Sequence, residues 1–505
     1  MKIAGLDIGT TGCKCTVFDE NGKKLGNSYR DYPVKRAVSG HDIDVSQIMA
    51  GVYGAIGEMT KLYPDIEGIG VTSFGETFVF TDDKGEPLHT AMVYTDPRGA
   101  DECRELEEKL GAAHIAEITG LRPHEMYSVS KMMYIKKHHP EIYEKAKHAF
   151  LMEDYVVFHL TGIAQIDYSL ATRTMAFDIS TLAWSEEIFQ AAGIDVKLMS
   201  KVVPTGTEAG VVSPEAARET GLAKSARVVS ISHDQVAAAV GAGAFDGSVA
   251  VDGAGTVECL TPIYDSMPNI DVMYKGYFSV VPYVIPGSYV AYAFSYTGGA
   301  LVDWCIKTFA AKEKEEAKAK GISANELLEK QYLDYCRDHE IDDKAPTGLL
   351  VLPHFAGAAT PYMDTGSKGA IIGLTAGTGL PEIYRACLEG VAYEMYLNYK
   401  ALFGSGIRFS KLNATGGGAH SALWMQMKAD VLNLPITALK TVDAGTVGSA
   451  MLTGIAIGIF RDLADAAGKM VEETVTYSPD NARHEAYMKV FEKYEKVYGA
   501  VRPLV

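Results

Sequence analysis

The sequence lacks the marks of a membrane protein or a nucleic-acid-binding protein. It has no uninterrupted apolar run of about 18 residues, so no membrane-spanning helix is predicted. Positive charge is in deficit, with 47 Lys and Arg against 64 Asp and Glu. The formal net charge of −17 disfavours binding to nucleic acid or to an anionic membrane surface. An anionic ligand would need local neutralisation by Mg²⁺, lysine or backbone N–H groups.

Cysteine is scarce and scattered, with seven residues in the whole chain. No Cys-x-x-Cys pair is present, which indicates neither a zinc site nor a disulfide framework. We expect reduced, mostly buried thiols in a cytoplasmic protein. The chain begins directly with a strand pattern, which argues against a signal peptide. The Gly-x-Gly-x-x-Gly fingerprint of a dinucleotide-binding unit is absent, and so is any short-period repeat.

Two short Asp/Gly/Thr segments, about half the chain apart, are the most informative features that are present. The first is Leu6–Lys14 and the second is Val251–Thr256. Each follows or includes an apolar run, then turns through glycines whose N–H groups, with neighbouring Thr hydroxyls, can face an anion. A chain of 505 residues is too long for one core. The two Asp/Gly/Thr segments therefore predict a duplicated domain, with nucleotide phosphates held between the copies.

The hydrophobic pattern mixes hairpins and helices and predicts an α/β protein. A Lys-, Glu- and Ala-rich stretch, 312–330, predicts a solvated helical excursion, with an acidic interaction arm as the alternative. Helical patterns dominate 101–147. Strands are expected at 1–6, 14–18, 69–73, 79–80, 228–232, 349–353 and 411–415, and helices at 45–63, 235–244, 422–432 and 446–460.

Four groups of segments, in order along nearly the whole chain, carry recognisable motifs: 7–11, 126–138, 369–374 continued by 382–389, and 415–418 with Gln426 and 429–430. This ordered set resembles the FGGY carbohydrate kinases. Tyr134 stands where Trp is usual in one signature, and Cys387 stands in place of a small or aliphatic residue in the other. No single motif is decisive, but the order is strong evidence.

The resemblance implies a fold of two actin-like (ribonuclease H-like) domains, as in the sugar kinase–heat-shock protein–actin superfamily, around a central cleft. We expect residues 1–245 to form the sugar-binding domain and residues 246–505 the ATP-binding domain. The implied cofactors are ATP and Mg²⁺. Fold alone does not give function, because this superfamily also includes chaperones and filaments.

Asp234 is the candidate general base, at a strand–helix junction. From the local sequence alone, a helix cap is an equal interpretation. The resemblance favours the base, because Asp234 matches the position of the family's catalytic Asp. Asp7 is the candidate Mg²⁺ anchor, through water, and Asp234 is also assigned to the metal.

The resemblance also implies an ATP site built from both halves. Thr10, Thr11 and Lys14 would face the β- and γ-phosphates, although Lys14 lies on a hairpin strand and can equally point to solvent. Further ATP contacts are expected from Gly255 and Thr256, which meet the phosphates from the opposite side, from Gly299, and from Gly417 and Ser421 near the adenosine.

The sugar pocket is expected mainly from the first half. Glu76 and Thr77 match the glycerol kinase version of the family's substrate motif, whereas Gly75 replaces an Arg. We expect this glycine to open volume and to remove a donor, so that the substrate is longer than glycerol. The remaining pocket candidates are Asp96, Tyr127 and Gln235. Asp96 alternatively forms a purely structural pair with Arg98, and Met126 is the alternative to Tyr127.

Together these residues predict an ATP-dependent kinase for a small sugar or polyol, with a ketopentose such as xylulose favoured. A kinase for another polyol, a deoxyketose or a sugar acid (erythritol, fuculose or gluconate type) is the alternative. A non-catalytic ATP-dependent interaction protein or a sugar sensor is the distant one. No nucleic-acid or membrane partner is expected, and a homodimer is the favoured oligomer.

Overall fold

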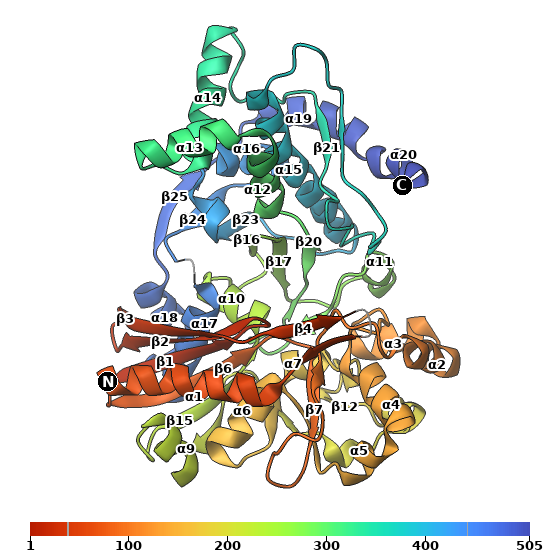
Figure 1. The fold of residues 1–505 in the computed structure, drawn as a ribbon, viewed down its shortest axis with the longest axis vertical. Helices are drawn as coiled ribbons and strands as arrows, with labels where there is room; N and C mark the ends of the chain where they lie inside the picture. The colour runs from red at the N-terminus through yellow and green to blue at the C-terminus, as the bar shows by residue number, and fades with distance from the viewer. Residues whose placement is uncertain (38–39, 442) are drawn as a thin grey trace.

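A computed structural model describes residues 1–37, 40–441 and 443–505 (Figure 1). The strands of the first half are β1 (Lys2–Ile8), β2 (Gly12–Asp19), β3 (Lys24–Asp31), β4 (Val34–Ala37), β5 (Gly40–Ile43), β6 (Ile66–Ser73), β7 (Phe78–Thr81), β8 (Ala91–Met92), β9 (His148–Leu151), β10 (Gln165–Asp167), β11 (Phe177–Asp178), β12 (Ala183–Trp184), β13 (Lys201–Val203), β14 (Thr207–Val211) and β15 (Arg227–His233). Its helices are α1 (Val45–Leu62), α2 (Ala100–Leu110), α3 (Ala112–Thr119), α4 (Ser128–His138), α5 (Pro140–Lys145), α6 (Met152–Thr161), α7 (Tyr168–Thr172), α8 (Glu186–Ala192), α9 (Pro214–Thr220) and α10 (Asp234–Gly241).

The second half follows the same alternation of strands and helices. Its strands are β16 (Val249–Ala254), β17 (Glu258–Tyr264), β18 (Val281–Pro282), β19 (Tyr289–Val290), β20 (Ala293–Ser295), β21 (Leu350–Leu352), β22 (Ala370–Ile372), β23 (Lys411–Thr415), β24 (Ile436–Leu439) and β25 (Glu473–Tyr477). Its helices are α11 (Ile270–Lys275), α12 (Gly299–Phe309), α13 (Ala311–Lys320), α14 (Ala324–Asp338), α15 (Leu380–Gly404), α16 (Ala422–Leu432), α17 (Ala444–Ala456), α18 (Leu463–Met470), α19 (Asn481–Tyr494) and α20 (Val497–Val501). None of the described helices combines the length and the apolar character that crossing a membrane requires.

The two main sheets repeat one order of strands. The first runs β3-β2-β1-β6-β15-β14, and the second contains β20-β17-β16-β23-β24-β25. In each sheet, three strands pair antiparallel, and the third of them is β1 or β16. Two further strands run parallel to β1 or β16, and an antiparallel strand follows at the edge. This repeat confirms the duplication predicted from the two glycine turns. The division predicted at residue 245 falls between α10 and β16, and it stays a prediction.

Helices cover both faces of the first sheet. Alternate residues of β1 face opposite sides: Leu6 packs with Ile48 and Val52 of α1, whereas Ile3 packs with Met451 of α17. Helix α17 therefore crosses from the second half of the sequence to cover the first sheet, beside α10 (Figure 1).

Three predicted helices end where a glycine takes a left-handed conformation. Helix α10 stops at Gly241, before Gly243 (φ 75°), and α17 stops shortly before Gly458 (φ 82°). The helical excursion predicted over 312–330 is divided at Gly321 (φ 66°) into α13 and α14. A glycine at the helix C-terminus adopts this conformation without a Cβ penalty, which explains why the apolar pattern alone overran the ends.

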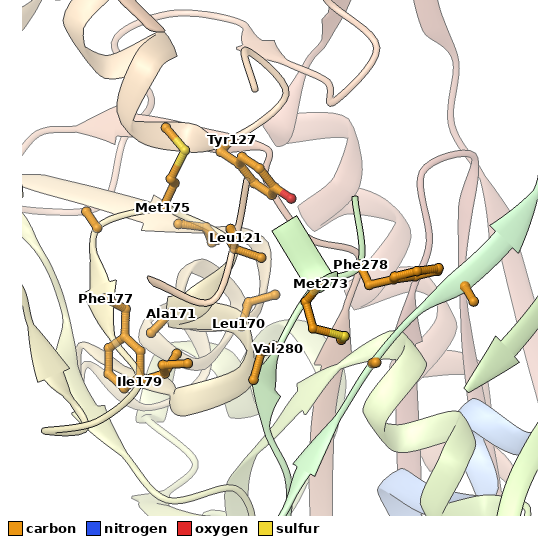
Figure 2. Packing of buried hydrophobic residues seen from close by; sticks show 14 of the residues in the cluster. Leu121, Tyr127, Leu170, Ala171, Met175, Phe177, Ile179, Met273, Phe278 and Val280 are labelled. Carbon is orange, nitrogen blue, oxygen red and sulfur yellow. The ribbon is translucent and has the colours of Figure 1, made fainter. Parts of the chain in front are cut away.

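A segment of the second half reaches across to the first. Residues 270–282 contain α11 and β18, which contact α3 and α7 respectively. Figure 2 shows Met273, Phe278 and Val280 of this segment among Leu121 and Leu170 of the first half, and all five are buried. This crossing places residues of the second half beside the candidate sugar site.

Candidate active site

Three parallel strands bring the candidate catalytic residues to one edge of the first sheet. Ile8 of β1 and His233 of β15 are both in register with Ser73 of β6. The carboxyl ends of these strands therefore lie side by side. Asp7 lies at the end of β1, and Asp234 directly follows β15. The loop after β6 carries Gly75, Glu76 and Thr77, so the structure joins these residues in one place.

Asp234 is a carboxylate whose surroundings favour its protonated form. It opens α10, and its side chain is 28% exposed. Burial is the largest effect, followed by the negative charges of Asp7 and then Glu76; together they raise the pKa of Asp234 to about 8. A carboxylate with a pKa near neutrality is suited to accept a proton during a reaction.

Two neighbours from different halves surround Asp234. His233 Nε2 lies 3.2 Å from Asp234 Oδ1, and His233 Nδ1 lies 3.2 Å from the hydroxyl oxygen of Tyr292. Burial, and then the charge of Arg173, hold the pKa of His233 well below its usual value, so the imidazole is neutral. A neutral imidazole at this place fits a packing and hydrogen-bonding residue rather than a second base.

Glu76 is held by an arginine that the sequence analysis did not select. Arg173, which follows α7, donates from Nε to Glu76 Oε1 at 2.7 Å and also from Nη2 to the same oxygen. Ser128 Oγ donates to the backbone carbonyl of Glu76 at 2.7 Å. Glu76 has φ 65°, a strained value for a residue other than glycine, and such strain persists where surrounding contacts hold it.

The expectation that Gly75 opens volume and removes a donor is wrong. A Cβ at Gly75 would lie 2.9 Å from Cγ of Arg173 and 3.1 Å from Cδ2 of His233. The space beside Gly75 is therefore filled by Arg173, which also returns a guanidinium to the site. The signal was weak because Arg173 lies in a segment, 168–173, that matched none of the motifs selected.

The other predicted sugar-site residues differ in burial and in their hydrogen-bond partners. Tyr127 is buried, with the centroid of its ring 5.2 Å from Cζ of Arg173. Thr77 is also buried, and its Oγ1 has no partner among the described residues. Gln235 is half-buried on the first turn of α10. The Asp96 carboxylate has no exposed surface and accepts from Arg98 and from the backbone N–H of His41.

The first phosphate loop lies against the start of α17. A Cβ on Gly445 would lie 2.6 Å from Oδ2 of Asp7. Burial, opposed by the charge of Lys14, raises the pKa of Asp7 to about 6. Lys14 Nζ lies 2.5 Å from Oδ1 of Asp443, and Thr10 is half-buried while Thr11 is exposed.

The carboxylates of the site offer few direct ligands for a metal ion. In the part of the chain that the structure describes, no group of three or more His, Cys, Asp or Glu residues is arranged to hold a metal ion. Burial is the largest cause of the raised pKa of both Asp7 and Asp234, and the charge of Asp7 raises the pKa of Asp234 further, so a cation between them would be stabilising. The pair fits a Mg²⁺ ion that keeps most of its ligands as water and phosphate oxygens.

The predicted nucleotide residues of the second half share one cavity. Its volume is about 610 Å³, and Gly255, Thr256, Gly299, Gly417 and Ser421 all line it. These residues come from the turns that follow β16 and β23, two parallel neighbours, and from the start of α12. Thr10, Thr11 and Lys14 do not line this cavity.

The cavity also uses residues that the sequence analysis missed. Helix α14, predicted as part of a solvated excursion, lines it with Asn325 and Glu329. Glu329 Oε1 accepts from Ser421 Oγ at 2.6 Å, and burial raises the pKa of Glu329. A Lys- and Glu-rich pattern gives no signal for such a role. The other residues of the lining are Ala254, Val302, Asp303, Ser323, Glu326, Tyr384, Leu388, Gly418, His420 and Trp424.

Comparison with protein families gives two matches that together span most of the chain. The N-terminal domain of the FGGY family of carbohydrate kinases matches residues 2–241, and the C-terminal domain of that family matches residues 254–457. These matches and the repeated sheets agree with the predicted α/β fold of two actin-like domains.

Curated relatives align along nearly the full chain. Xylulose kinase of Bacillus subtilis (strain 168) is 25% identical over 507 residues, which cover 99% of this chain and 97% of that protein. Glycerol kinase of Halorhodospira halophila is 30% identical over 483 residues, which cover 92% of this chain and 90% of that protein. The crystal structure of ligand-bound xylulose kinase from Lactobacillus acidophilus has a TM-score of 0.87, at 23% identity, and covers 99% of this chain and 98% of its own. That structural likeness concerns the fold alone.

Proposed function

The chain belongs to the FGGY family of carbohydrate kinases, and we propose that it transfers the γ-phosphoryl group of Mg-ATP to a hydroxyl of a ketopentose such as xylulose. Among the relatives are proteins named xylulose kinase, glycerol kinase and gluconokinase, so polyols, deoxyketoses and sugar acids are the alternatives. The observation that carries the proposal is Asp234, a carboxylate with a raised pKa beside Glu76 and Asp7.

In this mechanism, Glu76 binds substrate hydroxyls and Asp234 takes the proton of the attacking hydroxyl. The adenosine lies in the 610 Å³ cavity, and the phosphates extend toward Thr10, Thr11 and Lys14. Asp7 and Asp234 would hold a Mg²⁺ ion, which would neutralise negative charge on the phosphates. Asp96, whose fully buried carboxylate accepts from Arg98, is expected to hold Arg98 in place rather than to contact the sugar.

ADP release from Mg-ATP tests the proposal against a panel of ketoses, polyols, aldoses and sugar acids. Asp234→Asn is expected to lower the sugar-stimulated rate by about 10²–10⁴-fold, the typical contribution of a general base. No stimulation by any acceptor, with a slow ATPase activity that Asp234→Asn leaves unchanged, would contradict the proposal and favour a non-catalytic nucleotide-binding protein.

The family resemblance favours a cytoplasmic homodimer. All seven cysteines are buried and unbridged, which suits a reducing compartment. Light scattering on the purified protein measures the oligomeric state.

A further inference from the structure

Arg173 is a buried cation with hydrogen-bond donors to spare. A guanidinium carries five N–H groups. Three hydrogen bonds are formed: two to Glu76 Oε1, and one from Nη1 to Ser279 Oγ at 3.3 Å. Two N–H groups therefore have no partner among the described residues, although Arg173 is only 5% exposed. Buried donors are nearly always paired in folded proteins, so the spare N–H groups point to an acceptor that arrives with a ligand.

The spare donors belong to a guanidinium that lines a small cavity between the two halves. Tyr127 lines it from the first half, and Ser279 and Tyr292 line it from the second. The cavity volume is about 40 Å³, which holds roughly three water-sized groups. A second sugar ring does not fit in this space, whereas the short polar end of one monosaccharide does.

Glu76 complements Arg173 on the side of the reacting groups. Both hydrogen bonds from Arg173 go to Oε1. The other oxygen, Oε2, has no partner among the described residues and is not sealed from solvent. The ion pair thus offers an acceptor at Glu76 Oε2 and a donor at Arg173, and the negative charge of Glu76 is felt at Asp234. Neither Glu76 nor Asp234 lines the small cavity that Arg173 lines. A substrate that engages these two carboxylates and also fills the cavity therefore extends past them.

We propose that Arg173 is a specificity-determining residue that donates to a carbonyl or hydroxyl oxygen at the far end of the acceptor. The inference rests on the proposed function and deepens it, since it selects a ketose or polyol of four to six carbons over glycerol. Gly75 contributes to this specificity, because a Cβ there would lie 2.9 Å from Cγ of Arg173 and would displace that side chain. The charge of Arg173 is balanced by Glu76, which suits a neutral acceptor.

The test compares glycerol, erythritol, xylulose and fructose as acceptors and as ligands. The kcat/KM of each is measured by ADP release, and the Kd of each by calorimetry without ATP. Wild-type protein is expected to prefer the best longer acceptor over glycerol. Arg173→Met is expected to lower that preference by about 10- to 100-fold, the value of one hydrogen bond to a charged group. Arg173→Lys, which keeps the charge and one donor, is expected to restore part of it.

Because Arg173→Met leaves Glu76 without its partner, Gly75→Ala is the second variant. It keeps every charge and is expected to reduce the same preference by displacing Arg173. An even loss for glycerol and for the longer acceptors in these variants would overturn the inference and leave Arg173 as a residue that only positions Glu76. Wild-type preference for glycerol would overturn it as well. Binding of the longer acceptors without phosphorylation would overturn the proposed function alone, and the Kd values would still decide the role of Arg173.

Discussion

At the scale of single residues, the raised pKa of Asp234 ties stability to pH. The folded-state pKa is about 8, above the ordinary value of 3.8, so the folded protein binds this proton more tightly than the unfolded chain. The stability that results is fully present below about pH 4 and is lost as the pH rises to about 8. Asp234→Asn is therefore expected to raise the free energy of unfolding at pH 8 by about 1–3 kcal/mol, with no gain at pH 4.

Urea denaturation at the two pH values measures this difference. Asp271→Asn is the matched control, since the Asp271 side chain is 66% exposed, and its change should stay within about 0.5 kcal/mol. An Asp234→Asn variant that is no more stable than wild type at pH 8 would show that folding does not raise the pKa of Asp234.

The same carboxylate is expected to set the pH dependence of catalysis. A general base acts when ionised, so kcat/KM for the sugar should fall as the pH drops below the pKa of Asp234. Mg²⁺ bound at Asp7 and Asp234 would favour the ionised form, so this fall should begin below the metal-free value of about 8. The neighbouring imidazole adds no step near neutrality, because the pKa of His233 is held well below its usual value. Initial rates between pH 6 and 9 at low sugar concentration give the profile. A pH profile whose shape Asp234→Asn leaves unchanged would rule out Asp234 as the titrating base.

At the scale of elements, the crossing of α10 and α17 is tight enough to depend on glycine. A Cβ on Gly448 would lie 1.8 Å from the carbonyl oxygen of Ala237. Gly448→Ala must therefore separate the two helices, and overpacking of this kind costs about 1–3 kcal/mol or more. Because α10 begins with Asp234 and α17 begins beside Asp7, kcat should fall as well. Thermal denaturation and ADP release measure the two effects.

Gly57→Ala on α1 is the control for helix propensity. The nearest atom to a Cβ there is 3.8 Å away, so alanine is expected to stabilise the helix by about 0.5–1 kcal/mol. If Gly448→Ala were equally stabilising, the close approach of α10 and α17 would be wrong.

Local sequence patterns predicted helices well where apolar residues recur at regular helical spacing. The apolar spacing of 45–63 gave α1 almost to the residue, and 422–432 gave α16. The patterns failed where tertiary contacts decide. The composition of α14 suits a solvated helix, yet Glu329 bonds Ser421 in the nucleotide cavity. Similarly, nothing in the local sequence shows that Arg173 fills the space beside Gly75.

At the scale of the whole molecule, the duplication was predictable because two similar loops, Leu6–Lys14 and Val251–Thr256, lie half a chain apart. The crossings between the halves were not predictable. No pattern of charges or glycines in residues 270–282 indicates which part of the first half they contact. The contact between Ser279 and Arg173 is seen only in the folded chain. Hydrophobic burial is non-directional, so composition alone does not say which apolar surfaces will meet.

The nucleotide cavity and the candidate sugar site lie apart in the sequence, so the KM values for ATP and for the sugar should change independently. Every residue of the nucleotide cavity follows Gly253, whereas Glu76 lies in the first half, beside Arg173.

Glu329→Ala removes the partner of Ser421, whose hydroxyl also accepts from the backbone N–H of Trp424 at the start of α16. It is expected to raise KM for ATP about 3- to 10-fold, the loss of one hydrogen bond, and to leave KM for the sugar unchanged. Glu76→Gln is expected to do the reverse, because it weakens acceptance of sugar hydroxyls and leaves the nucleotide cavity intact. Initial rates with each substrate varied in turn measure both constants. A change in both KM values in either variant would contradict this prediction. It would indicate that the two pockets are coupled before ATP binds, for which the packed helices α10 and α17 are the connection between the halves.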